Sequence, residues 1–82
     1  MLEGRISKLD LDRRSAVIVA TDGREYTVSI PEEANIEVSE LETVGTMGGT
    51  IEDLEVGFHV VFEAKDHQPD GSCTCTNLES IS

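Results

Sequence analysis

The sequence predicts an all-β fold, a small five- to six-stranded antiparallel barrel. Apolar and polar residues alternate in several short segments, and β-branched residues fill others, which is typical of strands. Between two such segments lies Asp22-Gly23, a common hairpin signal because both residues tolerate the positive φ of a type I′ turn. At 82 residues the chain has room for one domain, residues 1–82. Closing the sheet into a barrel removes its exposed edges.

The first three predicted strands follow one another closely. They are expected at residues 2–9, 15–20 and 25–30, with a polar turn at 10–14. In the first and third of them, apolar side chains recur at every second position, so one face of each is expected to meet the core. Pro31 ends the third strand, because proline cannot donate to a ladder.

The segment 31–53 predicts an irregular, acidic and glycine-containing excursion. Residues 35–42 fit either a short strand or one helical turn, in which Ser39 and Glu42 have the spacing of a capping box. Residues 45–50 predict a flexible loop, because three glycines leave the backbone little restraint.

Strand patterns return after residue 54. A strand through residues 60–64, a turn at 67–72 and a final strand from residue 73 complete the predicted barrel. The apolar positions of the patterned segments predict its core, which is Ile6, Ile18, Val28, Val60, Phe62, Cys75 and Leu78.

The charge balance narrows the classes of partner. Seventeen acidic residues against six basic ones give a formal net charge of -11. Such a balance repels phosphate backbones and anionic lipids and favours cationic partners or a saline cytoplasm. No run of about 18 apolar residues and no signal-peptide pattern is present, so we expect a cytoplasmic chain without a membrane partner.

An acidic run after the third predicted strand is the candidate protein-binding surface. It holds five acids within eleven residues: Glu32, Glu33, Glu37, Glu40 and Glu42. Carboxylates at this density attract a basic protein, although a solvated loop has the same composition.

Several segments resemble a cold-shock domain, a five-stranded barrel of the oligonucleotide/oligosaccharide-binding (OB) type. The resemblance is carried by EGRISKLD, RRSAVIVATDGREYTVSI, LEVGFHVVFEA and DGSCTCTNL. It implies a closed barrel and an alternative function, the binding of single-stranded nucleic acid. The basic residues for that alternative are Arg5, Lys8, Arg13 and Arg14, with Lys65 as a further cation.

The aromatic residues of that family are missing from the positions that resemble its binding motifs. The position of its first-strand tryptophan corresponds to Lys8, and its other stacking positions correspond to Ser15, Val17, Thr27 and Ser29. Each base stacked on an aromatic ring contributes about 1–3 kcal/mol, and that contribution is absent. We therefore expect a barrel without a nucleic-acid ligand.

Cys73 and Cys75 are the cysteines of the chain. One residue apart on a strand, their side chains point the same way, so we interpret them as small core residues. A metal site is the alternative, with His67, and further with His59, Asp66 and Asp70, as additional donors. Zinc sites usually take a C-x₂₋₄-C spacing, which this pair lacks. We expect no resident metal and no cofactor.

Catalysis has little support in the sequence. The serines lie in no nucleophile-elbow motif, and neither histidine has an evident serine or cysteine partner. We expect a non-enzymatic, acidic OB-like interaction module that binds a protein. Binding of single-stranded nucleic acid and binding of a metal through Cys73 and Cys75 remain the alternatives.

Overall fold

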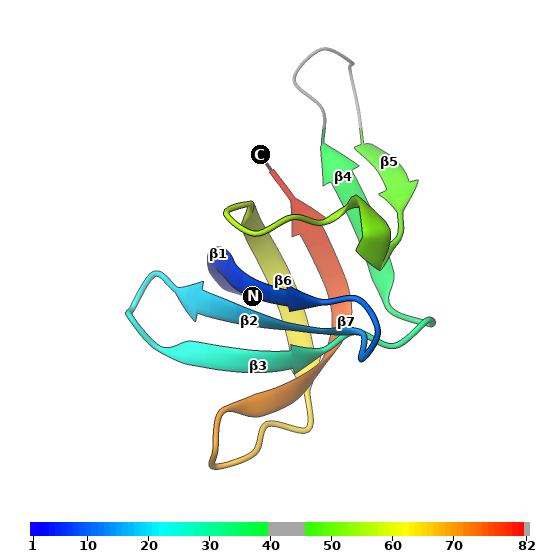
Figure 1. Cartoon of the computed structure of the whole chain (residues 1–82). Coiled ribbons are helices and arrows are strands. Elements are labelled where there is room, and N and C mark those ends of the chain that lie inside the picture. The colour runs from blue at the N-terminus through cyan, green and yellow to red at the C-terminus, as the bar shows by residue number, and fades with distance from the viewer. Residues whose placement is uncertain (40–45, 82) are drawn as a thin grey trace.

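The computed structural model describes residues 1–39 and 46–81, and strands dominate it (Figure 1). The strands and the single 3₁₀ turn are β1 (Leu2–Asp10), β2 (Ser15–Ala20), β3 (Glu25–Ser29), β4 (Asn35–Ser39), β5 (Thr46–Gly49), η1 (Ile51–Asp53), β6 (His59–Lys65) and β7 (Ser72–Ser80). The all-β prediction is confirmed. Among the described residues, no helix is long and apolar enough to cross a membrane.

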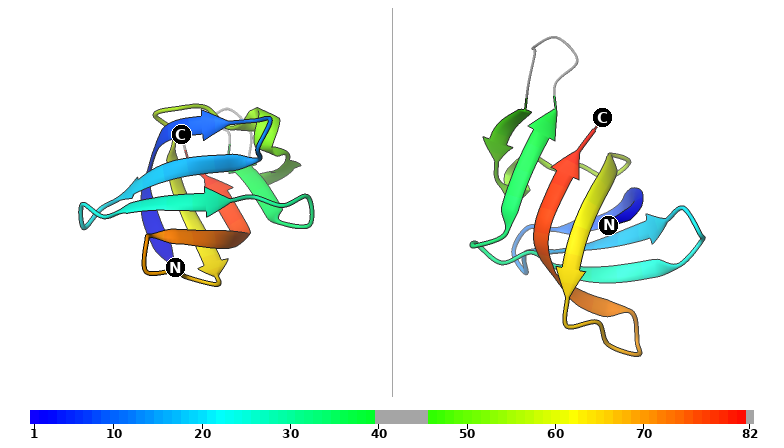
Figure 2. Two further views of the ribbon diagram at one scale, coloured as in Figure 1. Left: turned by 60° about the horizontal axis from the view of Figure 1, so that its bottom comes forward. Right: turned by 180° about the vertical axis from the view of Figure 1, so that it is seen from behind.

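Five of these strands close into a barrel (Figure 2). The antiparallel pairs β1–β2, β2–β3, β1–β6 and β6–β7 make a continuous sheet, and β3 then pairs with β7 in parallel. The predicted barrel is confirmed, with two parallel pairs that the sequence did not indicate: this closing pair and the pair of β4 with β7. Parallel neighbours need a long connection between them, and residues 30–71 supply it for β3 and β7.

β1 is central because its first half pairs with β6 while most of its length pairs with β2. Gly4 belongs to both pairs, and a Cβ built on it would lie 2.4 Å from the backbone oxygen of Val19. Only glycine fits this approach of two backbones. A bulge between Ile6 and Lys8 then shifts the register, so that Lys8 is exposed and Leu9 packs against the core.

A second bulge reverses the side-chain alternation in β7. Glu63 pairs with Asn77 and Ala64 with Cys75, so the intervening Thr76 is the extra residue. Its hydroxyl donates to the carbonyl of Glu63 at 3.2 Å. The bulge turns both Cys75 and Leu78 inward, although they lie three residues apart in a strand of period two.

The β2–β3 hairpin forms at the predicted place with a different turn. Gly23 has a φ of +89°, whereas Asp22 does not have a positive φ, so the turn is not type I′. The amide of Gly23 donates to the carbonyl of Ala20, and the Asp22 carboxylate accepts the amide of Arg24 at 3.0 Å. This is the three-residue loop in which a turn is followed by a glycine in the left-handed region.

Residues 31–53 are more regular than the sequence predicted where they are described. β4 and β5 form a hairpin, so the strand alternative for residues 35–39 is confirmed and the flexible loop at 46–49 is wrong. Glu42 lies outside the described residues, and the capping box observed is formed by Thr50 and Asp53 of η1. The segment also contributes the core residues Ile36 and Ile51.

The predicted core is confirmed at every position. Ile6, Ile18, Val28, Val60, Phe62, Cys75 and Leu78 are each no more than 2% exposed. The Tyr26 ring packs edge-on against Phe62, with centroids 6.2 Å apart, at the margin of this core. Alternation along each strand therefore places the remaining side chains on the outer surface, where a binding site has to lie.

Candidate functional site

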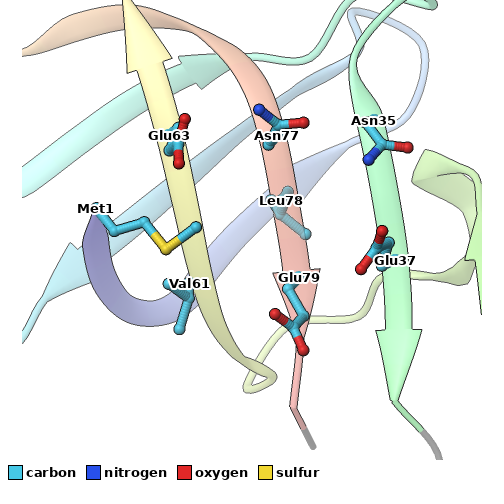
Figure 3. Close-up of a pocket in the computed structure, with 8 residues that line it drawn as sticks. All are labelled: Met1, Asn35, Glu37, Val61, Glu63, Asn77, Leu78 and Glu79. Carbon is cyan, nitrogen blue, oxygen red and sulfur yellow. The ribbon is translucent and has the colours of Figure 1, made fainter. Parts of the chain in front are cut away.

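The outer surface of β6, β7 and β4 is the candidate site, and we call it the acidic face. It consists of the outward residues of these three neighbouring strands: Val61, Glu63, Asn77, Glu79, Asn35 and Glu37 (Figure 3). The alternate residues of the same strands, such as Phe62 and Leu78, are buried in the barrel. The pattern of each strand thus fixes which side chains the face presents.

The register arranges these side chains in two rows across the strands. In one row Glu63 pairs with Asn77, and Asn77 with Asn35. In the other row Val61 pairs with Glu79, and Glu79 with Glu37. On the far side of Val61, its β1 partner is Glu3.

A shallow pocket of about 180 Å³ lies between the two rows. Figure 3 shows the carboxylates of Glu37, Glu63 and Glu79 around it, with the amides of Asn35 and Asn77 between them. Met1 and Val61 add apolar surface, and the Met1 side chain is 80% exposed. The face therefore offers hydrogen-bond acceptors, negative charge and some apolar contact area together.

The charge of the chain is segregated along the sequence. Residues 1–31, which form β1 to β3, hold five acids and five bases. Residues 32–82 hold twelve acids and one base, Lys65, so the whole net charge of -11 resides there. Among the described strands, β4, β6 and β7 carry Glu37, Glu63 and Glu79 against Lys65, whereas the charges of β1 to β3 are nearly balanced.

The structure divides the predicted acidic run. Glu37 is a half-buried member of the acidic face. Glu32 and Glu33 are exposed in the turn before β4, and Glu32 lies near Arg14 at a different shallow pocket. Glu40 and Glu42 lie outside the described residues.

Sequence reasoning missed Glu63 and Glu79 as companions of Glu37. They lie 26 and 42 positions further along the chain, and they meet Glu37 only because β7 pairs with both β6 and β4. Alternation in β6 shows that Val61 and Glu63 point away from the core. No pattern in the sequence, however, shows which strand lies beside β4.

The four basic candidates for nucleic acid lie on β1 and in the turn after it. Arg5 and Lys8 are exposed opposite Val19 and Val17 of β2. Arg13 forms an exposed ion pair with Asp10 at 3.9 Å, and exposed pairs contribute at most about 1 kcal/mol.

Arg14 has a structural role at the base of this turn. It adopts a φ of 50°, and its Nε donates to the carbonyl of Ile30 at 3.0 Å. Lys65, the additional basic candidate, is the last residue of β6 and lies away from the other four basic residues. Of these four residues, Arg5 and Lys8 have no such contact with the turn. Val17 and Thr27, which lie in register with Lys8, offer no aromatic ring.

The metal candidates do not come together. Cys73 and Cys75 are free thiols inside the barrel, 4% and 1% exposed. Burial, with a further contribution from Cys73, raises the pKa of the Cys75 thiol to about 11, and burial also raises the pKa of Cys73. His67 is exposed and packs edge-on against Tyr26, with centroids 6.3 Å apart.

The remaining donors are engaged elsewhere. The Nε2 atom of His59 lies 2.6 Å from Oε1 of Glu3, and the Asp70 carboxylate accepts the amide of Ser72 at 2.9 Å. The hydroxyl and the amide of Ser72 lower the pKa of Asp70. Within residues 1–39 and 46–81, no group of three or more His, Cys, Asp or Glu side chains could hold a metal ion.

Comparison with known proteins supports the fold and no further property. No family model matches the sequence, and no curated protein matches it. Among solved structures, the chain is similar to CusF with Ag(I), at 11% identity and a TM-score of 0.62, over 98% of this chain and 93% of that one. It is also similar to a tryptophan-to-alanine variant of Escherichia coli CusF with Cu(II), at 15% identity and a TM-score of 0.58, over 99% and 89%. The chain is therefore a small closed β-barrel of OB-like architecture, and the cold-shock resemblance is confirmed only at this coarser level.

Proposed function

We propose that the chain is a non-enzymatic interaction module that binds a basic segment of a protein on its acidic face. The observation that carries this proposal is the register that sets Glu37 beside Glu79 and places Glu63 in the adjoining row. Like charges at directly neighbouring positions of a sheet repel each other. A cationic partner converts the repulsion into attraction.

The uneven distribution of charge favours the approach of a basic segment to the acidic face. A basic segment is attracted to the carboxylates of Glu37, Glu63 and Glu79 and meets nearly balanced charges along β1 to β3. Electrostatic steering of this kind raises association rates and weakens with salt, because the Debye length is about 8 Å at physiological ionic strength. The amides of Asn35 and Asn77 then supply hydrogen bonds once the partner has docked.

A peptide titration tests the proposal. A labelled lysine-rich peptide is added to the protein and to a Glu37→Gln/Glu63→Gln variant, and fluorescence anisotropy is followed at low and physiological salt. Each exposed charge pair contributes about 0.2–1 kcal/mol, so the double variant should bind about 2- to 30-fold more weakly. Both substitutions keep the shape of the side chain and remove only its charge.

Glu25→Gln is the matched control, because Glu25 is an exposed strand residue on β3, outside the acidic face. It should change the dissociation constant less than twofold. If the control weakens binding by half as much in free energy as the double variant, or by more, only total charge matters and the acidic face is not the binding site. The absence of saturable binding would also contradict the proposal.

A second candidate function is binding of a soft metal ion, supported by the Ag(I) named with one of the two similar structures. The donors that lie near each other are the two thiols Cys73 and Cys75 on β7, and thiolates suit such ions. Both thiols must lose protons that burial favours. If Ag(I) binds to these thiols, one equivalent should raise the melting temperature of the protein. The same addition should leave the melting temperature of a Cys73→Ala/Cys75→Ala variant unchanged. An unchanged melting temperature of the parent protein would exclude this function.

A further inference from the structure

β5 is the edge strand next to the acidic face. The strand order of the sheet ends at β5, and within the described part of the chain its only paired neighbour is β4 (Figure 1). Figure 2 shows the β4–β5 hairpin standing at the side of the barrel, beyond β7. An edge strand presents a row of backbone amides and carbonyls to any chain that can pair with them.

The sequence of β5 does nothing to block such pairing. Natural edge strands are usually protected by lysine, other charges or proline, and β5 reads Thr-Met-Gly-Gly. Proline would remove a donor, and a charge would oppose the approach of an apolar strand. Neither is present in this strand, so its sequence does not oppose an added strand.

The register connects this edge to the carboxylates. Gly48 pairs with Glu37, which itself pairs with Glu79, so the row Val61–Glu79–Glu37 continues to Gly48. Neighbouring strands lie about 4.8 Å apart, so a residue paired with Gly48 from outside lies about 10 Å from the Glu37 backbone. Glycine has no side chain to fill that interval. A lysine or arginine on the added strand spans it.

We propose that β5 accepts an extended basic segment of the partner as an additional strand, with lysine or arginine at alternate positions reaching over Gly48 toward Glu37. This inference rests on the proposed function and adds the conformation and the sequence pattern of the ligand. Backbone hydrogen bonds to β5 contribute affinity that does not depend on sequence, and the alternate basic side chains contribute specificity. A basic helix or a folded basic surface cannot make the same contacts.

Three peptides test it. The parent peptide has about eight residues that alternate lysine and threonine, and two derivatives carry N-methyl groups on all lysine amides or on all threonine amides. The amides of alternate residues point to the same edge of a strand, and those of the residues between them point to the other edge. Strand addition therefore requires that one derivative loses binding while the other keeps it. Each lost hydrogen bond weakens binding about 2- to 12-fold, so the affected derivative should bind at least about fivefold more weakly than the parent.

Amide hydrogen exchange gives a second readout. The parent peptide should slow exchange in β5, at Gly48 or Gly49, and the affected derivative should not. If both derivatives bind within twofold of the parent, strand addition is wrong and the acidic face still binds the peptide. If the parent itself does not bind, the proposed function fails, and this inference fails with it.

Discussion

Substitution of Gly4 by alanine tests how tightly the barrel closes around β1. A Cβ at this position would lie 2.4 Å from the backbone oxygen of Val19 and 2.9 Å from both Cα of Ala20 and Cγ2 of Ile18. Ordinary carbon–oxygen contacts are about 3.3 Å, so the oxygen and the new methyl group must separate by about 0.9 Å. The nearest atoms belong to the backbone of β2, which cannot rotate away as a flexible side chain can.

The free-energy change follows from two opposing effects. Overpacking of a well-packed site costs about 1–3 kcal/mol. Replacing glycine by alanine recovers about 0.4–1 kcal/mol, because the unfolded chain loses conformational freedom. Since Gly4 is in register with both β2 and β6, the strain cannot relax toward either neighbour, and the net loss should be about 1–2 kcal/mol. For a domain of this size that lowers the melting temperature by roughly 5–15 °C.

Thermal unfolding followed by circular dichroism measures the effect. Ser7→Ala on the same strand is the control, since Ser7 is exposed and loses only a hydrogen bond of 3.3 Å to the carbonyl of Val17. It should change stability by no more than about 0.5 kcal/mol. If Gly4→Ala melts within about 2 °C of the parent, the close approach of β1 and β2 at this point is wrong.

Three other outcomes are expected. Folding raises the pKa of Cys75 from 9.0 to about 11. The protonated thiol therefore contributes fully to the stability of the folded state below pH 9, and this contribution is lost as the pH rises to about 11. Urea unfolding at several pH values should show this decline in the parent and a flatter profile in Cys75→Ala. Ser72→Ala should raise the lowered pKa of Asp70 toward 3.8 in an NMR titration, and an unchanged Asp70 titration would count against the hydrogen bonds that Ser72 donates. Single-stranded oligonucleotides should show no saturable binding at micromolar protein in near-physiological salt, whereas a micromolar dissociation constant weakened by Lys8→Ala or Arg13→Ala would favour the cold-shock-like alternative.

Local patterns predicted the strands and the core because each depends on neighbours in the sequence. Alternation and β-branched runs located β1, β2, β3, β6 and β7, and every residue expected in the core is buried. Alternation alone places Cys75 and Leu78 on opposite faces. Only the bulge at Thr76 brings both into the core, and a bulge has no reliable signal in a single sequence.

Long-range pairing was not predictable from the same patterns. The parallel pairs of β7 with β3 and β4 depend on which strands meet in space, and the sequence shows only the segments. The acidic face depends on the same pairs, since Glu37 meets Glu79 through β4–β7 and Glu63 joins them through β6–β7. The sequence therefore identified Glu37 as a candidate but assigned it companions from its own segment.

The most direct test of the account is a map of the bound peptide on the protein. Backbone amide spectra of the ¹⁵N-labelled protein should be recorded while the alternating lysine–threonine peptide is added to saturation. The account predicts shift changes concentrated at Glu37, Glu63, Glu79 and the β5 edge, with the amides of β2 and β3 unchanged. Changes centred instead on Arg5 and its β2 neighbours, or no changes at saturating peptide, would contradict it.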